Sequence, residues 1–386
     1  MTRRRVLLVQ PSMQPPGGGN GVAAWMAQAL APHHDLTILS WWPVDVAPIN
    51  RFFGTALSAR DFHTHVVPSS WRAAIGSLPV PSALLRSSLL MRYTRRIAAN
   101  YDIVMGAHNE TDYGRRGIQY VHYPAYLRPR PAVDMRWYHA GPLLGIYYRL
   151  ADALAGFSLE RMKGNLTLVN SDWTAARVRR SLGIDAITLY PPVVGEDEGP
   201  DWEARRPGFL AMGRISPEKE YERVINILAL VRREQPDVTL TIVGTFDGAT
   251  RGYFNALNAL VESLGAANWV TFRQDLPREE VRSLIATQKY GIHGMREEHF
   301  GMAPAEMVRG GMIVWVPNGG GQTEIVGQAP LLRYDSEQQA AEQIVAVMRD
   351  AGRQRELRAH LRKMGESFGV DRFVRAIQSL VANFEP

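Results

Sequence analysis

The sequence has no cysteine among its 386 residues, so disulfides, thiolate metal sites and cysteine nucleophiles are excluded. It also lacks an unbroken apolar run of about 18 residues, the length that predicts a membrane-spanning helix. The best candidate, residues 141–157, is broken by Arg149 and Asp152. The apolar run that follows the basic residues 3–5 is too short for a signal peptide. These absences predict a cytoplasmic protein.

Lysine is scarce as well, because only Lys163, Lys219, Lys289 and Lys363 accompany the arginines. Charge is also spread unevenly: residues 1–190 hold 21 Lys and Arg against 11 Asp and Glu, net +10, and the remainder is net −4. A basic first half indicates an anionic partner, such as nucleic acid, a phospholipid surface or a phosphorylated substrate. A general preference for arginine explains the same bias, and both interpretations stay open.

Two common nucleotide-binding patterns are missing from the first glycine-rich segment, residues 17–21. Val22 stands where the dinucleotide fingerprint G-x-G-x-x-G requires its last glycine, and no P-loop lysine follows. No Asp-x-Asp pair occurs anywhere in the chain. The glycines still allow the backbone to approach a ligand closely. The NAD and P-loop interpretations are therefore disfavoured, while a ligand-facing loop is expected.

Short apolar strands alternate with helical segments along both halves of the chain, which predicts parallel sheets with helices on both faces. We expect a first domain over 1–192, a linker over 193–206, a second domain over 207–367 and an amphipathic helix over 368–386. The expected strands are 5–10, 36–40, 101–105, 118–121 and 166–170 in the first domain, and 208–212, 238–243, 269–272, 290–295 and 312–316 in the second.

Two segments of the first half bear on its partners. Residues 79–97 predict a basic amphipathic helix, which either packs on a sheet or lies on an anionic membrane. Residues 123–157 interleave aromatic side chains with arginines, as expected for an amphiphilic acceptor or for base stacking on nucleic acid. No RNP, helix-turn-helix or zinc pattern supports nucleic acid. Membrane contact would appear as salt-sensitive binding to anionic vesicles, and equal binding to neutral vesicles would contradict it.

The most informative segment is 291–326. It predicts a buried strand, a charged loop, a short helix, a second strand and a glycine-rich turn. This βαβ order predicts parallel strands, whose ligands bind beyond the strands' carboxyl ends. The residues that follow the first strand are Arg296, Glu297, Glu298 and His299, and then Phe300, Gly301 and Met302 at the start of the helix. The N–H groups at that helix N-terminus form a ready anion site.

The acids and glycines of this segment are specific as an ordered set. One Glu is followed eight positions later by a second, then by two glycines, an apolar strand, two more glycines and a third Glu. These are Glu298, Glu306, Gly310, Gly311, Ile313–Val316, Gly320, Gly321 and Glu324. The set resembles the donor-binding signature of retaining glycosyltransferases of the GT-B fold, family 4, also called glycosyl transferases group 1. With His299 in place of the usual glycine, it resembles most the α-mannosyltransferases that extend dolichol-linked oligosaccharides, and their prokaryotic relatives.

A second segment is similar to the family's diphosphate clamp, Gly-Arg-x4-Lys. It consists here of Gly213, Arg214 and Lys219, with Glu220 in place of a common glycine. From the residues alone, Gly213 permits a tight turn, and the two cationic side chains can converge on one anion.

Histidines after predicted strands are candidates for chemistry. His122 follows the strand 118–121 and, in a VHYP context, resembles the active-site histidine of the family. His108 and Asn109, past the end of the preceding strand, are expected in the same cleft. His293 lies within a predicted strand, so we expect it in the core.

The resemblance covers nearly the whole chain and implies a GT-B architecture of α/β class, in which two doubly wound Rossmann-like domains face each other across a cleft. It also implies that the helix over 368–386 crosses back to the first domain. It implies transfer of a hexose from a nucleotide sugar with retention of configuration. GDP-mannose is the expected donor, and a glycan or lipid-linked molecule the expected acceptor. Neither a cofactor nor a metal nor nucleic acid is expected. The enzyme would be cytoplasmic, or peripheral on the inner face of the cell membrane.

The resemblance also implies roles. The clamp and the amides of residues 300–302 would stabilise the departing diphosphate, Glu306 would hold the ribose, and Glu298 would bind the sugar near its developing positive charge. His122 would contact the sugar from the first domain when the cleft closes. The expected catalytic residues are Glu298, His122, Arg214 and Lys219. The expected donor site is Gly18, Gly19, Asn20, Gly213, Arg214, Lys219, Glu298, His299, Phe300, Gly301, Met302 and Glu306.

Three alternatives stay open. The first is a transferase for UDP-glucose or UDP-N-acetylglucosamine that acts on a small molecule or a polysaccharide. The second is a glycosidase that pairs Glu298 with Glu306, although eight residues of helix span about 12 Å, whereas glycosidase carboxylates lie about 5–9.5 Å apart. The third is a module that binds RNA or anionic lipid, which nucleoside diphosphates would not stabilise.

Overall fold

The computed structural model describes residues 3–76, 83–124, 144–195 and 199–386. The chain divides into two compact units, each described by itself below: unit 1 comprises Met1–Pro192 and Asp371–Pro386, and unit 2 comprises Val193–Val370. Some features expected from the sequence lie outside the described residues. They are the start of the basic helix at 79–82, the aromatic residues Tyr126, Trp137 and Tyr138, and the linker acids Glu196, Asp197 and Glu198.

Unit 1 is built on a seven-stranded parallel sheet with the order β3-β2-β1-β4-β5-β6-β7. Its strands are β1 (Arg5–Val9), β2 (Asp35–Ser40), β3 (His63–Val66), β4 (Ile103–Gly106), β5 (Ile118–Val121), β6 (Leu166–Val169) and β7 (Ile187–Thr188). Its helices are α1 (Gly18–Leu30), α2 (Val46–Phe53), α3 (Ser69–Gly76), α4 (Ala83–Ile97), α5 (Leu144–Ala155), α6 (Leu159–Lys163), α7 (Asp172–Leu182) and α15 (Val370–Ala382).

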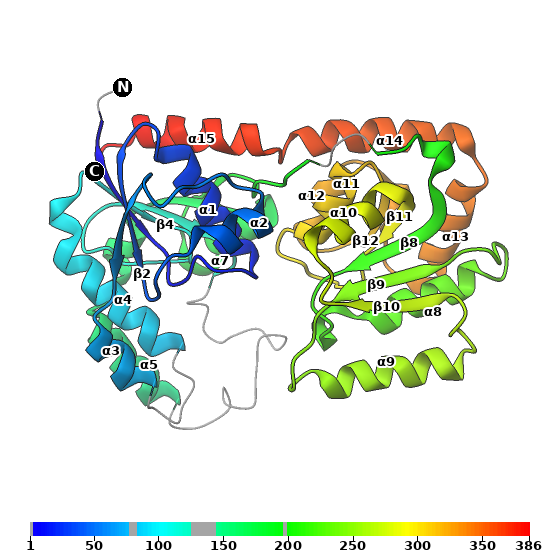
Figure 1. The fold of residues 1–386 in the computed structure, drawn as a ribbon, viewed down its shortest axis with the longest axis horizontal. Coiled ribbons are helices and arrows are strands. Elements are labelled where there is room, and N and C mark those ends of the chain that lie inside the picture. The colour runs from blue at the N-terminus through cyan, green and yellow to red at the C-terminus, as the bar shows by residue number, and fades with distance from the viewer. Residues whose placement is uncertain (1–2, 77–82, 125–143, 196–198) are drawn as a thin grey trace. The chain divides into compact units, whose positions relative to one another are not determined.

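Unit 2 has a six-stranded parallel sheet with the order β10-β9-β8-β11-β12-β13. Its strands are β8 (Arg206–Met212), β9 (Leu240–Gly244), β10 (Val270–Gln274), β11 (Gln288–Ile292), β12 (Ile313–Pro317) and β13 (Arg333–Tyr334). Its helices are α8 (Tyr221–Val231), α9 (Arg251–Ser263), α10 (Arg278–Thr287), α11 (Met302–Arg309), α12 (Gln322–Val326), α13 (Glu337–Met348) and α14 (Ala351–Glu366). Helices flank both faces of each sheet (Figure 1).

Central strands are buried on both faces, which explains their continuous apolar sequences. In β1, residues 6–9 have no exposed surface, and β12 is buried along its whole length. The expected α/β class with two doubly wound sheets is confirmed. In the part of the chain that the structure describes, no helix combines the length and apolarity needed to cross a bilayer.

Both sheets reverse their strand order beside the first strand of the unit. β1 lies between β2 and β4, and β8 lies between β9 and β11. Doubly wound sheets bind ligands outside the carboxyl ends of their strands at this reversal. In unit 1 the residues that follow β1 and β4 include 10–20 and 107–109, and in unit 2 those that follow β8 and β11 include 213–219 and 293–301. The topology therefore places the predicted site segments of each unit at such an edge.

Residues 199–206, assigned to a linker from the sequence, pack on unit 2 instead. Trp202 is 6% exposed, its Nε1 donates to Gln354 Oε1 at 3.0 Å, and its ring meets that of Tyr290 edge-on with centroids 5.8 Å apart. The glycine, proline and charged residues of this segment are typical of a linker. The buried Trp202 side chain, whose N–H has a hydrogen-bond partner, nevertheless attaches the segment to unit 2.

Two arginines of the predicted basic helix, now α4, have a structural role. Arg92 Nη1 donates to Leu154 O at 3.2 Å, and Arg95 Nη1 donates to Ala155 O at 3.0 Å. These carbonyls belong to the last turn of α5, where a helix leaves its acceptors without partners. The basic charge of α4 is therefore partly explained by helix capping, and membrane contact stays a prediction.

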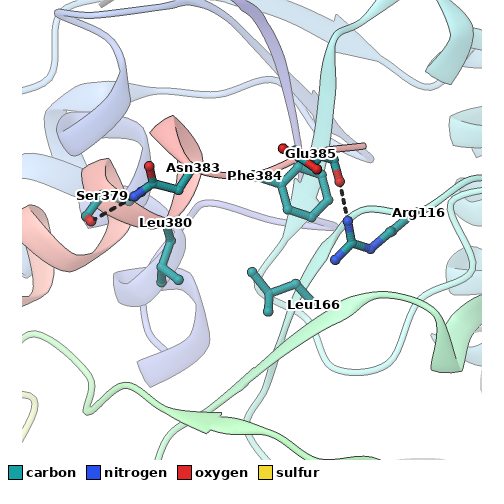
Figure 2. A pocket seen from close by; sticks show the side chains of 7 residues that line it. All are labelled: Arg116, Leu166, Ser379, Leu380, Asn383, Phe384 and Glu385. Atoms are coloured by element: carbon teal, nitrogen blue, oxygen red, sulfur yellow. Dashed lines mark hydrogen bonds between the residues drawn. The ribbon is translucent and has the colours of Figure 1, made fainter.

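Helix α15 completes unit 1. It buries Phe373, Ile377 and Val381, and Gln378 Nε2 donates to Ala29 O of α1 at 3.0 Å. The pocket at its end, drawn in Figure 2, is lined by Arg116, Leu166, Ser379, Leu380, Asn383, Phe384 and Glu385. The Arg116 guanidinium lies 5.0 Å from the Phe384 ring centroid and donates to the main-chain oxygen of Glu385. No residue predicted for the site lines this pocket.

Candidate functional site

In unit 1 the candidate site is centred on His122, directly after β5. Asn109 Oδ1 accepts the N–H of His122 at 2.8 Å and that of Tyr123 at 3.2 Å, while Asn170 Nδ2 donates to His122 O at 3.0 Å. The ring Nε2 lies 2.9 Å from Ala107 O. Because a carbonyl only accepts, Nε2 holds the proton, and in the neutral ring Nδ1 is the acceptor. The fold thus fixes both the backbone and the tautomer of this histidine.

The first glycine-rich segment meets this histidine. Helix α1 already begins at Gly18, so Gly18, Gly19 and Asn20 form its first turn rather than a loop. A Cβ on Gly19 would lie 2.9 Å from His122 Nε2, so only glycine lets the ring approach so closely. Asn20 accepts from Gln10 Nε2 at 2.9 Å, which ties the turn to the end of β1. The structure therefore brings two predicted segments together.

His108 and Asn109 differ in their roles beside His122. Asn109 has φ 78°, in the left-handed region that asparagine tolerates better than most residues. His108 Nδ1 lies 3.2 Å from Val9 O, and Nε2 lies 3.3 Å from Thr111 Oγ1. Burial lowers the pKa of His108 to about 4, the hydrogen bond to Val9 opposes this, and His122 adds to the lowering. His108 is therefore neutral at physiological pH.

In unit 2 the candidate site is centred on the Glu298 carboxylate. Lys219 Nζ donates to Glu298 Oε2, and His293 Nε2 lies 3.3 Å from the same oxygen. The side chains are 16% exposed for Lys219, 17% for Glu298 and 4% for His293. Burial raises the pKa of Glu298, but Lys219 and His293 outweigh it and hold that pKa well below its usual range. The carboxylate is thus ionised in a nearly enclosed place.

Glycines allow the loops around this carboxylate to approach one another. A Cβ on Gly320 would lie 2.3 Å from Glu298 O, and one on Gly294 would lie 2.6 Å from Lys219 O. Gly213 has φ 143°, and a Cβ there would lie 3.2 Å from the Tyr221 hydroxyl. The glycine-rich turn after β12 therefore supports the backbone of Glu298 directly, and Gly321 N donates to Glu298 O at 2.7 Å.

Glu220, where the family commonly has glycine, has φ 49°. Glu220 separates two helical segments: residues 217–219 form a 3-10 turn, and α8 begins at Tyr221. A left-handed conformation favours glycine and costs other residues about 1 kcal/mol. Arg223 Nη2 at 2.6 Å and Arg296 Nε at 3.3 Å hold the Glu220 carboxylate and offset part of this cost.

Other predicted residues have separate partners. Arg214 is 68% exposed and pairs with Glu218 at 3.1 Å, so its guanidinium and Lys219 have different carboxylates. Glu306, on α11, pairs with Arg278 at 3.0 Å, with both side chains 17% exposed. Convergence of Arg214 and Lys219 on one anion stays a prediction. It requires the two side chains to turn from Glu218 and Glu298 towards that anion.

The predicted anion site at the start of α11 has the geometry of a helix N-terminus. Gly301 precedes the helix with φ 104°, and Gly301 O accepts from Ala305 N at 3.0 Å. Phe300 is buried, whereas Met302 and His299 are half-buried. The first N–H groups of a helix have no partner within the helix, so they are suited to an anion.

Sequence reasoning missed three features of these sites. His293 was expected in the core, and it is buried, but its ring contacts Glu298. Asn170 holds His122, and the hydroxyls of Ser216 and Tyr221 are buried without a hydrogen-bond partner in the described part of the chain, a pattern typical of groups that bind water or a ligand. No signal in the sequence pointed to this contact of His293, because the sequence predicts a strand over 290–295, whereas β11 ends at Ile292 and His293 follows it. Over the same residues, no group of three or more His, Asp or Glu is placed to hold a metal ion.

Comparisons with known proteins bear on unit 2 most directly. Residues 197–368 match a family model described as glycosyl transferases group 1. GDP-Man:Man(3)GlcNAc(2)-PP-Dol alpha-1,2-mannosyltransferase of Dictyostelium discoideum is 27% identical over 200 residues, which cover 46% of this chain and 38% of that protein. The human protein of that name is 28% identical over 223 residues, which cover 53% and 44%. The chain thus matches less than half the length of these relatives.

A solved structure shares the fold. Anabaena HepE in complex with UDP has a TM-score of 0.70 at 17% identity, and the match covers 99% of this chain and 100% of that chain. Identity this low shows the fold alone. The expected GT-B fold class is confirmed, and so is the resemblance read from residues 291–326, because the family match spans that segment.

The lowered pKa of His108 predicts a pH dependence of stability. Stability from the neutral ring is complete above its usual pKa and is lost as the pH falls towards about 4, because the unfolded chain then binds a proton that the folded site refuses. At pH 5 the loss should be about 2 kcal/mol. His108→Asn keeps a donor for Val9 O without titrating, so its melting temperature should fall several degrees less than that of the wild type between pH 7.5 and 5 (about 2–4 °C per kcal/mol). Exposed His65→Asn is the control. Equal losses in the wild type and His108→Asn would contradict the assignment.

Proposed function

We infer from the match of residues 197–368 to the glycosyl transferases group 1 that this chain is a glycosyltransferase, and we propose that it moves a hexose from a nucleotide sugar to a hydroxyl acceptor with retention of configuration. One observation supports the proposal most. Lys219 of the clamp and Glu298 of the donor signature lie 79 residues apart in sequence, yet they meet at the ligand-binding edge of unit 2.

The chemistry needs anion stabilisation next to a carboxylate. During transfer the diphosphate departs as an anion while the sugar gains positive charge, and preorganised charges stabilise both. We propose that Arg214, Lys219 and the amides of residues 300–302 stabilise the diphosphate, and that Glu298 stabilises the sugar. Glu298 suits this role because its lowered pKa keeps it ionised.

The remaining roles follow the resemblance. We propose that Glu306 binds the ribose hydroxyls and that His122 binds the sugar. Arg278 holds the Glu306 carboxylate, so a ribose would share or replace that contact. The Nδ1 acceptor of His122 suits a sugar hydroxyl, which donates a hydrogen bond.

GDP-mannose is the donor that we propose, supported by the names of the two relatives. A UDP-sugar is the alternative, because HepE was solved in complex with UDP. For the acceptor we propose a glycan or lipid-linked molecule on the cytoplasmic side. Metal independence and contact with an anionic membrane are part of the same proposal, the first because the clamp and the helix amides supply positive charge to the phosphates.

The rival functions fit the geometry less well. A glycosidase needs a carboxylic acid whose pKa is raised, whereas that of Glu298 is lowered. Glu298 also lies in the loop before α11, so the helical spacing to Glu306 assumed from the sequence is wrong. A module that binds RNA or lipid through unit 1 leaves the Lys219–Glu298 ion pair of unit 2 unexplained.

A panel of nucleotide sugars tests the proposal. GDP-mannose, UDP-glucose and UDP-N-acetylglucosamine are each incubated with the protein, and release of the nucleoside diphosphate is followed. We expect slow hydrolysis of one donor, together with a raised melting temperature in the matching diphosphate, GDP or UDP. Neither stabilisation nor release with any member of the panel would contradict the proposal.

Lys219→Ala should weaken binding of the matching nucleoside diphosphate by about 1.5–3 kcal/mol, the size of a hydrogen bond to a charged group. Two causes add: the diphosphate loses a cation, and the Glu298 carboxylate is left to repel it. Calorimetry measures the affinity. Lys289→Ala is the matched control, since Lys289 lies over the Trp202 ring at 5.5 Å from its centroid and should leave binding unchanged. An unchanged affinity in Lys219→Ala would remove this lysine from the site.

Glu298→Gln should separate binding from turnover. It keeps the shape of the side chain but deletes the charge, so turnover should fall by about 10²–10³. The same change releases Lys219 from its carboxylate, so diphosphate affinity should hold or rise. Initial rates and calorimetry on one preparation give both values. Wild-type turnover in this variant would show that the assignment of Glu298 is wrong.

A further inference from the structure

We propose that His293 is a positioning residue that holds the Glu298 carboxylate in place while Lys219 turns to the departing diphosphate. The inference rests on the proposed function and adds a residue to it. Sequence reasoning places His293 in the core, and no role in the reaction follows from its burial alone. Its contact with Glu298 is what makes the role specific.

The backbone of His293 is fixed at both its N–H and its carbonyl. It continues β11, where His293 N donates to Trp315 O of β12 at 2.9 Å. The Tyr334 hydroxyl of β13 donates to His293 O. Contacts with β12 and β13 thus define the position of the His293 side chain, which is 4% exposed. A side chain held in this way is a rigid support for a more mobile neighbour.

The ring presents a donor to Glu298. Burial lowers the pKa of His293, and the contact with Glu298 only partly opposes this, so the imidazole is neutral at physiological pH. A neutral imidazole has one N–H, and a carboxylate oxygen 3.3 Å away accepts it, which assigns the proton to Nε2. The groups that face His293 are Glu298 and Lys219 at the ring and Tyr334 at the carbonyl.

The Lys219 ammonium has two anionic partners that compete for it: the Glu298 carboxylate and the proposed diphosphate. The ammonium neutralises Glu298, and it also contacts Met295 Sδ at 3.5 Å. A diphosphate would draw the same ammonium away from the carboxylate. Glu298 would then keep one donor, His293, together with the backbone support from Gly320 and Gly321. His293 therefore preserves the orientation and the charge of Glu298 at the moment when both act on the sugar.

Two substitutions separate this role from simple packing. His293→Leu fills the site without a donor, whereas His293→Gln places an N–H near the position of Nε2. His360→Leu is the matched control, because the ring Nε2 of His360 also makes a hydrogen bond within unit 2, to Val326 O at 2.8 Å on α12. The probes are the nucleotide sugar that the wild type hydrolyses and its nucleoside diphosphate.

We expect His293→Leu to lower kcat about 10- to 100-fold, the loss of one hydrogen bond to a charged group, while diphosphate affinity changes less than about threefold. His293→Gln should recover most of the rate. His360→Leu should lower the melting temperature without lowering kcat. Normal turnover in His293→Leu, equal loss in the Gln and Leu variants, or a parallel loss of diphosphate affinity would each overturn the proposal. An inactive wild type would instead refute the proposed function.

Nitrogen NMR of the histidine-labelled wild type tests the contact without relying on folding of the variants. The resonance of His293 should show a neutral ring protonated at Nε2 between about pH 7 and 8. It should shift in Glu298→Gln, because the acceptor loses its charge. A charged ring, a proton on Nδ1, or a resonance indifferent to Glu298→Gln would also overturn the proposal.

Discussion

One buried negative charge governs the ligand-binding edge of unit 2. A carboxylate taken out of water requires compensation, and Glu298 obtains it from Lys219 and from the ring of His293. For these groups to meet, the loops after β8, β11 and β12 must nearly touch, and this is possible because glycines stand where the loops come together. Substituting either Gly294 or Gly320 would force the backbone apart and separate the charge from its partners.

The candidate site of unit 1 is centred on a different kind of side chain, the imidazole of His122. There the central group is an imidazole ring rather than a carboxylate, and main-chain carbonyls and amide side chains hold it. Asn109 and Asn170 fix the backbone of His122, and Ala107 O fixes its proton. The two sites share a placement, directly beyond the carboxyl ends of parallel strands, where side chains are anchored by the sheet yet stay open to a ligand.

The sequence could reveal what depends on local pattern. Apolar runs predicted the strands, and the family resemblance of two separate motifs predicted that Lys219 and Glu298 serve one site. Features that depend on contacts distant in sequence escaped it. Periodicity placed His293 in a strand but could not show which group its ring meets. Composition marked residues 193–206 as a linker, although the environment of Trp202 was decided by Gln354 and Tyr290. Glu220 stands where the family commonly has glycine, which fits its left-handed conformation, but the sequence did not show that Arg296, 76 residues on, joins Arg223 in holding its carboxylate.

Unit 1 consists of two stretches of chain, and all of unit 2 is inserted between them. Its final piece, α15, supplies Phe373, Ile377 and Val381 to the core, and its Gln378 Nε2 donates to Ala29 O of α1. Just after the helix, Phe384 O accepts from Arg4 Nη1. On the ribosome these residues emerge after all of unit 2. The domain that begins first therefore finishes second, against the usual N-to-C order of folding during synthesis. Until then the apolar surface of unit 1 that Phe373, Ile377 and Val381 cover is exposed. A transcript truncated before residue 371 would therefore encode every donor-site residue on a protein whose first unit has all its strands but lacks α15.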